Sequence, residues 1–190
     1  MEEKTVRYRI TGTAPLLMSN VQMANPLNEF AQAIRKISSK RKKTISDHKE
    51  LARLEFMGRL YLGKNRKPVI PGYMIESMLA EAAKKEKLGK VFKAVVFCDG
   101  VFLLEYDGPT DPDKLWKIDS YQLTSAVGIR GAKVMRTRPQ FPEWSLEFPI
   151  TYIDGEVEPD AIDRAIERAG IIVGLGDWRP KYGRFKVEKK

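Results

Sequence analysis

The stretch KPVIPGYMIESMLAEAA, from Lys67 to Ala83, carries the clearest structural signal in the chain. Its two prolines and its glycine cannot continue a helix, so GKNRKPVIPG, over 63–72, should be a loop. The apolar residues that follow recur at helical spacing on one face: Ile75, Met78, Leu79, Ala82 and Ala83. We therefore predict a helix over 72–85, with Gly89 as its stop.

Several segments on both sides of this helix read as strands. The N-terminal KTVRYRI places Val6, Tyr8 and Ile10 on one face and two arginines on the other, which is typical of a half-buried strand. EWSLEFPITYI, over 143–153, alternates in the same way. RFKVE, over 184–188, supplies closing strand material together with IIVGLG, over 171–176. VFKAVVFCDGVFLLEY, over 91–106, is broken by Asp99-Gly100 and predicts a β-hairpin.

Two further regions read as helical. Apolar residues keep helical spacing over 25–63, but a basic run interrupts them, and Ser46 or Asp47 can cap a second helix there. Another helix is predicted over 159–169, since Pro159 suits a first helical position and Gly170 can end the helix.

This order of elements defines a fold class. Without its insertions the chain reads βαββαβ, so we predict an α+β protein with a ferredoxin-like core, similar to RNA-recognition domains. The chain should form a single domain over 1–190, with a helical insertion over 19–67 and a basic, thumb-like hairpin excursion over 118–142. Both core helices should cover one face of the sheet and leave the other free.

Composition restricts the chemistry that the chain can perform. A hydrophobic fraction of 43% over 190 residues suits a folded domain, and no apolar run is long enough to span a membrane. The N-terminus lacks a signal peptide, so we expect a cytoplasmic protein. Cys98 is the only cysteine, which excludes an internal disulfide and cysteine-based zinc sites, and we expect it to be a buried, inert thiol.

The formal net charge of +9 is segregated along the sequence. Three segments hold most of the excess: 35–43, 130–138 and 174–190. Segregated charge makes a surface patch that suits a polyanion, with nucleic acid ahead of a membrane surface. The third segment contains GLGDWRPKYGRF, over 174–185, in which glycines, basic residues and aromatic residues occur together.

Two motifs add a family resemblance. KPVIPGYMIESMLAEAA resembles the PGSSLKG-like helix start of the RAMP superfamily, the CRISPR-associated RNA-binding proteins. GLGDWRPKYGRFKV, over 174–187, resembles the glycine-rich C-terminal loop of that superfamily. The arrangement is similar to a backbone subunit of a CRISPR effector complex, or to a stand-alone relative of one. The resemblance implies single-stranded guide RNA, further copies of the protein along that RNA, and other effector subunits as partners.

The resemblance also bears on catalysis. Target-cleaving relatives carry an aspartate in the loop after the first strand, whereas the corresponding loop here, over 14–28, has no acid. His48 is the only histidine and lies on the polar face of a predicted helix start, which favours a surface or capping role. We therefore predict a non-enzymatic protein with no catalytic residue, no metal site and no cofactor.

Binding remains as the predicted activity. Basic side chains neutralise phosphates and aromatic rings stack on bases. The RNA-binding candidates are Arg130, Lys133, Arg136, Arg138, Arg179, Lys181 and Arg184, with Arg7 and Arg9 as weaker ones. Three other readings stay open: a general single-stranded nucleic-acid-binding protein, a mimic of an effector subunit encoded by a mobile element, and a RAMP-type endoribonuclease that processes CRISPR RNA with His48 as its base.

Overall fold

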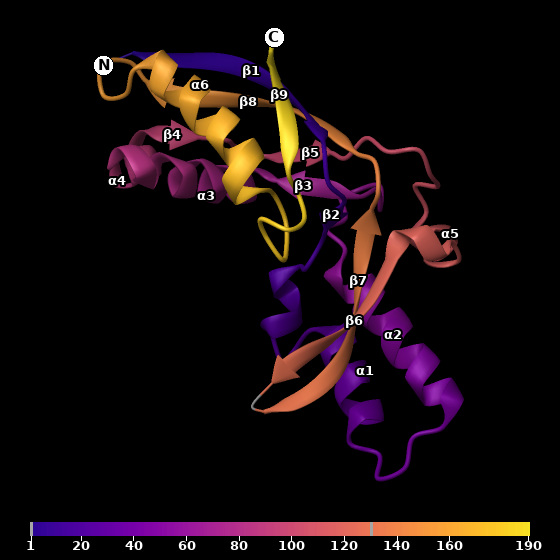
Figure 1. The fold of residues 1–190 in the computed structure, drawn as a ribbon. Helices are drawn as coiled ribbons and strands as arrows, with labels where there is room; N and C mark the ends of the chain where they lie inside the picture. The colour runs from indigo at the N-terminus through magenta and orange to yellow at the C-terminus, as the bar shows by residue number, and fades with distance from the viewer. Residues whose placement is uncertain (1, 130) are drawn as a thin grey trace.

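The computed structural model describes residues 2–129 and 131–190. Its centre is a four-stranded antiparallel sheet with the order β4-β8-β1-β9. The strands are β4 (Val96–Phe97), β8 (Ser145–Ile153), β1 (Glu3–Gly12) and β9 (Phe185–Lys189). Two helices, α3 (Gly72–Ala83) and α6 (Pro159–Arg168), lie side by side across one face of the sheet (Figure 1). This is the ferredoxin-like βαββαβ unit, so the predicted α+β fold class is confirmed.

The main core lies between this sheet and its two helices. Tyr8 and Ile10 of β1 are buried toward the helices, as their alternation predicts. The predicted apolar face of α3 is buried against them, and each large side chain in such a position contributes about 1.5–3 kcal/mol. The Tyr8 hydroxyl donates to Asp163 Oδ1 of α6 at 2.6 Å, while Lys189 Nζ donates to Asp163 Oδ2 at 2.6 Å. The hydrogen bonds tie α6 to the middle of the sheet.

A second group of elements projects from one end of the sheet, at the bottom of the view in Figure 1. We call it the helix–hairpin lobe. It comprises η1 (Val21–Ala24), α1 (Glu29–Ser38), α2 (Ile45–Arg59), β6 (Gln122–Ile129) and β7 (Ala132–Phe141). Strand β2 (Leu16–Leu17) pairs with the end of β7 and so joins this lobe to the core. The helices fall within 19–67 and the hairpin within 118–142.

Helix α2 begins at a different cap from the one its sequence suggested. We expected Ser46 or Asp47, but Thr44 is the N-cap. Thr44 Oγ1 accepts from the Asp47 N–H at 3.1 Å, and Asp47 Oδ2 accepts from the Thr44 N–H at 2.9 Å. This reciprocal capping box satisfies two backbone donors, whereas a later start would leave them unpaired.

The segments on both sides of α3 correct three predictions. The hairpin expected over 91–106 is wrong, because that segment holds α4 (Gly89–Val95), β4 and β5 (Val101–Leu103). β4 pairs with β8, whereas β5 pairs with β3 (Val69–Pro71), a strand inside the expected loop 63–72. Gly89 starts α4 and does not end α3. Helix α3 is instead followed by η2 (Lys84–Glu86) and by Lys87, whose φ of 64° lies in the left-handed region.

The polar segment after β5 also forms secondary structure. It contains α5 (Pro112–Trp116) and η3 (Asp119–Tyr121). Asp111 caps α5 by accepting from the Asp113 N–H at 2.9 Å. Such a short helix is stabilised by its cap and by the burial of Leu115. It is too short to show a periodic apolar pattern in the sequence.

The predicted strand over 171–176 is wrong as well. Helix α6 continues past Gly170 into a π-helical turn, η4 (Ala169–Val173). A Cβ at Gly170 would lie 2.3 Å from the Phe185 carbonyl oxygen, so this glycine allows β9 to approach the turn and does not end the helix. Only the second half of the predicted closing material, β9, forms a strand.

Candidate nucleic-acid interface

The glycine-rich segment over 174–184, which we call the C-terminal loop, is fixed against the chain that leaves β1. The Asp177 N–H donates to the Leu17 carbonyl at 2.9 Å, and the Gly183 N–H donates to the Pro15 carbonyl at 2.8 Å. From the other side, the Thr13 N–H donates to the Arg184 carbonyl at 2.8 Å. These bonds attach the loop to the core at both ends.

Two glycines make this close approach possible. A Cβ at Gly176 would lie 2.3 Å from the Leu17 carbonyl oxygen, and one at Gly183 would lie 1.7 Å from the Leu175 carbonyl oxygen. Both residues also have positive φ, at 84° and 75°. The loop therefore needs glycine at these positions for its shape, and its polar side chains are displayed on a fixed backbone.

The β6–β7 hairpin meets the C-terminal loop through an ion pair. Arg138 Nε of β7 donates to Asp177 Oδ2 at 2.6 Å, and the Arg138 side chain is only 14% exposed. Two residues earlier on the same strand, Arg136 Nη1 donates to Glu55 Oε1 of α2 at 2.5 Å. Glu55 is 4% exposed and its other oxygen accepts from the Thr137 N–H at 2.8 Å. The basic excursion and the C-terminal loop, distant in sequence, thus lie together.

Arg59 at the end of α2 completes this junction. Its Nη1 donates to the Ser19 hydroxyl at 3.2 Å, but no carboxylate of the described residues pairs with it. Its Nε is buried without a hydrogen-bond partner. Burial lowers the pKa of Arg59, and the nearby Arg138 and Arg136 act in the same direction, against the opposite effect of Glu55.

We call Glu55, Arg59, Arg136, Arg138 and Asp177 the waist cluster, since it joins the two parts of the molecule. It holds three arginines against two carboxylates, and both carboxylates are already paired. Beside it lies a pocket of about 250 Å³, the waist pocket, to which Arg35, Arg59, Arg136 and Glu55 contribute. A pocket with this excess of guanidinium groups suits an anion that can accept several hydrogen bonds, such as a phosphate.

The exposed side of the C-terminal loop carries cations and aromatic rings. Lys181 Nζ lies 5.3 Å from the centre of the Trp178 ring and 5.8 Å from that of Tyr182. The guanidinium carbon of Arg138 also lies 5.9 Å from the centre of the Trp178 ring. Arg179 and Arg184 are exposed, and Arg179 Nη1 donates to the Gly174 carbonyl at 3.3 Å. The three basic loop residues therefore reach solvent.

The other predicted binding residues do not gather at the waist. Lys133 is exposed near the outer end of the hairpin. Arg130 lies outside the residues that the structure describes. Arg7 and Arg9 occupy β1, on the sheet face opposite the two helices. The described members of the set predicted from sequence thus divide between the waist, the C-terminal loop, the hairpin and the free sheet face.

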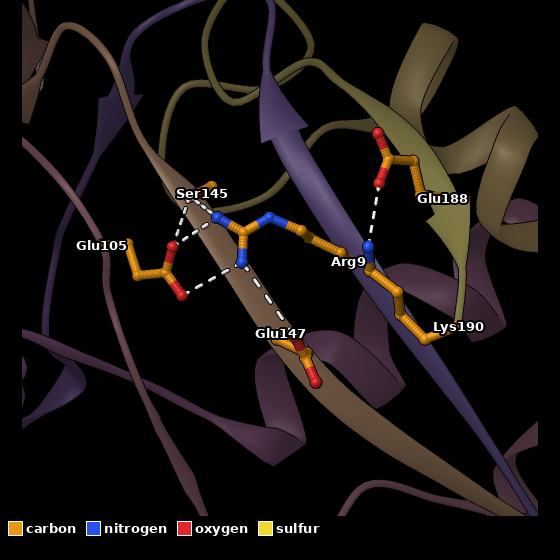
Figure 2. A network of polar contacts seen from close by, with 6 residues as sticks. All are labelled: Arg9, Glu105, Ser145, Glu147, Glu188 and Lys190. Carbon is orange, nitrogen blue, oxygen red and sulfur yellow. Dashed lines mark hydrogen bonds and ion pairs between the residues drawn. The ribbon is translucent and has the colours of Figure 1, made fainter.

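Arg9 is engaged within the protein, as Figure 2 shows. Its guanidinium pairs with the carboxylate of Glu105, with one contact at 3.1 Å, and donates to the Ser145 hydroxyl at 2.9 Å. Glu147 lies 4.0 Å away, and the adjacent Glu188 pairs with Lys190 at 3.2 Å. The Arg9 partner lowers the pKa of Glu105. The free sheet face is therefore charge-compensated around Arg9, in contrast to the waist.

His48 lies in a groove between α2 and the hairpin. This groove has a volume of about 550 Å³, and Lys43, Lys133 and Met135 contribute to it. The His48 side chain is exposed, as its place on the polar face of the helix predicts. Two lysines beside a histidine make the groove basic, so it extends the cationic surface along the hairpin.

Other chemistries find little support. Within 2–129 and 131–190 no group of three or more His, Cys, Asp and Glu side chains is arranged to hold a metal ion. The helices of this part of the chain are each too short or too polar to cross a bilayer. Cys98 is buried, as predicted, and burial raises the pKa of its thiol to about 12, so it stays protonated at neutral pH.

Sequence reasoning missed Arg59 and Arg35 as site residues. Arg35 begins a basic run, but nothing local distinguishes it from its neighbours. Arg59 sits among the apolar residues of α2, between Met57 and Leu60, where a charged residue is unusual. The position of Arg59 among apolar residues was therefore the one signal that could have marked it as a site residue.

Comparison with known proteins finds similarity among solved structures. No protein-family model and no curated protein matches the sequence. Among solved structures, the chain is similar to one chain in the cryo-EM structure of the Type III-B Cmr-beta complex bound to cognate target RNA, with 14% identity and a TM-score of 0.52. The match covers 99% of this chain and 61% of that one, so this chain spans about three fifths of its length. This chain therefore has a fold similar to that of the matched part of the other chain.

Proposed function

We propose that this protein is a non-catalytic RNA-binding protein that holds the phosphate backbone of single-stranded RNA at the waist. The observation that carries the proposal is Arg59. A guanidinium that is partly desolvated, lies beside two other arginines and forms no ion pair with a carboxylate of the described residues is costly unless an anion binds to it. An RNA phosphate supplies that anion.

The surroundings of Arg59 favour a polyanion over a single small ion. The waist pocket and the basic groove along the hairpin share Glu55 and Arg136 in their linings. Arg138 links the waist cluster to the exposed cations of the C-terminal loop. A strand of RNA places a phosphate at every nucleotide and can therefore occupy several of these positions at once.

The fold similarity supports a specific setting for this activity. A chain of similar fold belongs to a CRISPR effector complex that was solved with target RNA. In our proposal this protein serves as a guide-RNA-binding backbone subunit, with further copies and other effector subunits as neighbours. Mass measured by light scattering should then rise with RNA length, whereas a constant mass with one protein per RNA would exclude assembly along the strand.

The test of backbone binding is its dependence on salt. If about five phosphates are neutralised, log K should fall against log salt with a slope of roughly −3.5 for single-stranded RNA. Homopolymers of different sequence should bind with similar affinity, because phosphate contacts carry no sequence information. A slope near zero, or no binding at low salt, would refute the proposal. Matched DNA as competitor distinguishes an RNA-binding protein from a general single-strand-binding one.

A second candidate, an RNA-processing endoribonuclease, is favoured by one observation. His48 faces the groove that also contains Lys43 and Lys133, and a histidine base beside a cationic donor is what cleavage by a 2′-hydroxyl requires. Incubation with CRISPR-repeat RNA decides between the two. Our proposal predicts intact RNA with both the wild type and His48→Ala, whereas cleavage by the wild type that His48→Ala abolishes would establish the nuclease.

A further inference from the structure

A further pocket, to which Arg138 contributes, lies between the hairpin and the C-terminal loop. Its volume is about 320 Å³, roughly ten times the ~30 Å³ that one water molecule occupies in the liquid. The hairpin side is formed by Ala126, Val127 and Gly128 of β6, and the loop side by Asp177 and Trp178. Small residues on one side and an indole on the other leave a space that suits a flat ring.

Trp178 is held in an unusual way for a large aromatic residue. Its side chain is 42% exposed, and its φ of 54° lies in the left-handed region, which is rare for bulky residues. The hydrogen bonds that attach the C-terminal loop to the core hold this conformation in place. The indole is thereby presented to solvent on a fixed backbone, whereas a more favourable backbone conformation would change its direction.

The charge around the indole specifies the kind of ring that fits. Arg138 and Lys181 both lie within 6 Å of the ring centre, at 5.9 Å and 5.3 Å. Arg138 also belongs to the waist cluster, where we place a phosphate. A ligand that stacks on Trp178 and carries a phosphate toward Arg138 satisfies both features, and a nucleotide of the bound strand is such a ligand.

We propose that this pocket, the base pocket, receives one nucleobase of the bound RNA, stacked on Trp178. The inference rests on the proposed function and deepens it, since the protein then holds one base per subunit as well as the backbone. Stacking tolerates any base because every base has a π face, so the pocket adds affinity without selecting sequence.

Fluorescence tests the contact directly. Of the three tryptophans, Trp144 is 3% exposed, Trp116 is half-buried and Trp178 is 42% exposed, so acrylamide should quench mainly Trp178 in the free protein. Bound RNA should protect that fraction, and RNA containing 2-aminopurine should lose fluorescence as its base stacks. If RNA binds but Trp178 stays open to acrylamide and 2-aminopurine is unaffected, the base pocket is refuted and backbone binding stands.

Affinity tests the contribution of the stacked base. The wild type should bind normal RNA about 5- to 150-fold more tightly than a ribose-phosphate oligomer of equal length without bases, which is the range of one stacked base. Trp178→Gly should abolish that preference and leave the melting temperature and the salt slope nearly unchanged, because glycine adopts a φ of 54° freely. Trp178→Phe should retain part of it.

The matched control is Ile171→Ala, an exposed apolar residue of η4 with 70% exposure. This variant should keep the full preference for RNA with bases. Equal binding of both oligomers by the wild type, with the salt slope intact, would refute the base pocket alone. Failure to bind either oligomer would refute the proposed function and this inference with it.

Discussion

At the scale of single residues, the arginines of the waist cluster differ in what balances them. Arg136 and Arg138 have carboxylate partners, at 2.5 Å and 2.6 Å, whereas Arg59 has only the Ser19 hydroxyl at 3.2 Å. An arginine that is paired with a carboxylate helps to hold the fold together. A partly buried arginine without such a partner destabilises the fold, and a bound anion can offset that cost. Stability and RNA binding should therefore respond differently to substitution at these positions.

For the uncompensated residue we predict a gain in stability with a loss of function. Arg59→Met removes a desolvated charge and keeps an unbranched apolar chain, so the free energy of unfolding without RNA should stay level or rise by about 1 kcal/mol. Urea denaturation of the free protein measures this change. A fall of more than about 2 kcal/mol would mean that Arg59 serves the fold and would remove the main argument for an anion at the waist.

For the compensating carboxylate the prediction is opposite. Glu55→Ala leaves the Thr137 N–H and the Arg136 guanidinium without their acceptor in a site where Glu55 is 4% exposed. We expect a loss of about 2–3 kcal/mol, since an unpaired buried donor costs about 1–3 kcal/mol and Arg136 retains access to water. The same urea measurement checks it, and a neutral result would show that β7 is held by other contacts.

At the scale of elements, α2 carries a pH-dependent cap. Lys40, whose Nζ lies 2.6 Å from Asp47 Oδ1, and the Thr44 N–H together lower the pKa of Asp47 to about 2. Because the folded pKa lies below the ordinary value near 4, the contribution of this carboxylate is complete above pH 4 and is lost as the pH falls toward 2.

Asp47→Asn tests this cap. The melting temperature of the wild type minus that of the variant should shrink as the pH falls from 4 to 2, since other carboxylates with lowered pKa are present in both proteins and cancel. Calorimetry across this range measures the difference. A constant difference would show that the charge of Asp47 does not contribute to the cap.

Elements with a long, regular apolar pattern could be predicted from the sequence, and short ones could not. The alternation in β1 and β8 and the stripes of α3 and α6 gave the correct core. The run over 91–106 misled because a short apolar segment suits a buried helix as well as a strand, and its two halves pair with different sheets. The choice depended on partners distant in sequence.

At the scale of the whole molecule, the candidate site exists only because separate parts of the chain meet. From the sequence both the basic excursion and the C-terminal loop were candidates for binding, and Arg138 with Asp177 brings the two segments together. The sequence could not indicate that α2 reaches the same place, because the contact between Glu55 and Arg136 spans 81 positions. The ion pair of Arg9 could not be foreseen for the same reason, since its partner Glu105 is 96 positions away.

The central claim is that the waist holds RNA phosphate, and one measurement tests it most directly. The salt dependence of binding to single-stranded RNA should be compared for the wild type, Arg59→Gln and a control, Arg164→Gln, whose guanidinium pairs with Glu86 on the helical side of the core. We predict that Arg59→Gln weakens binding to every sequence and makes the slope shallower by about 0.7, the value for one phosphate on a single strand, while the control matches the wild type. Equal affinity and slope for Arg59→Gln and the wild type would contradict the claim.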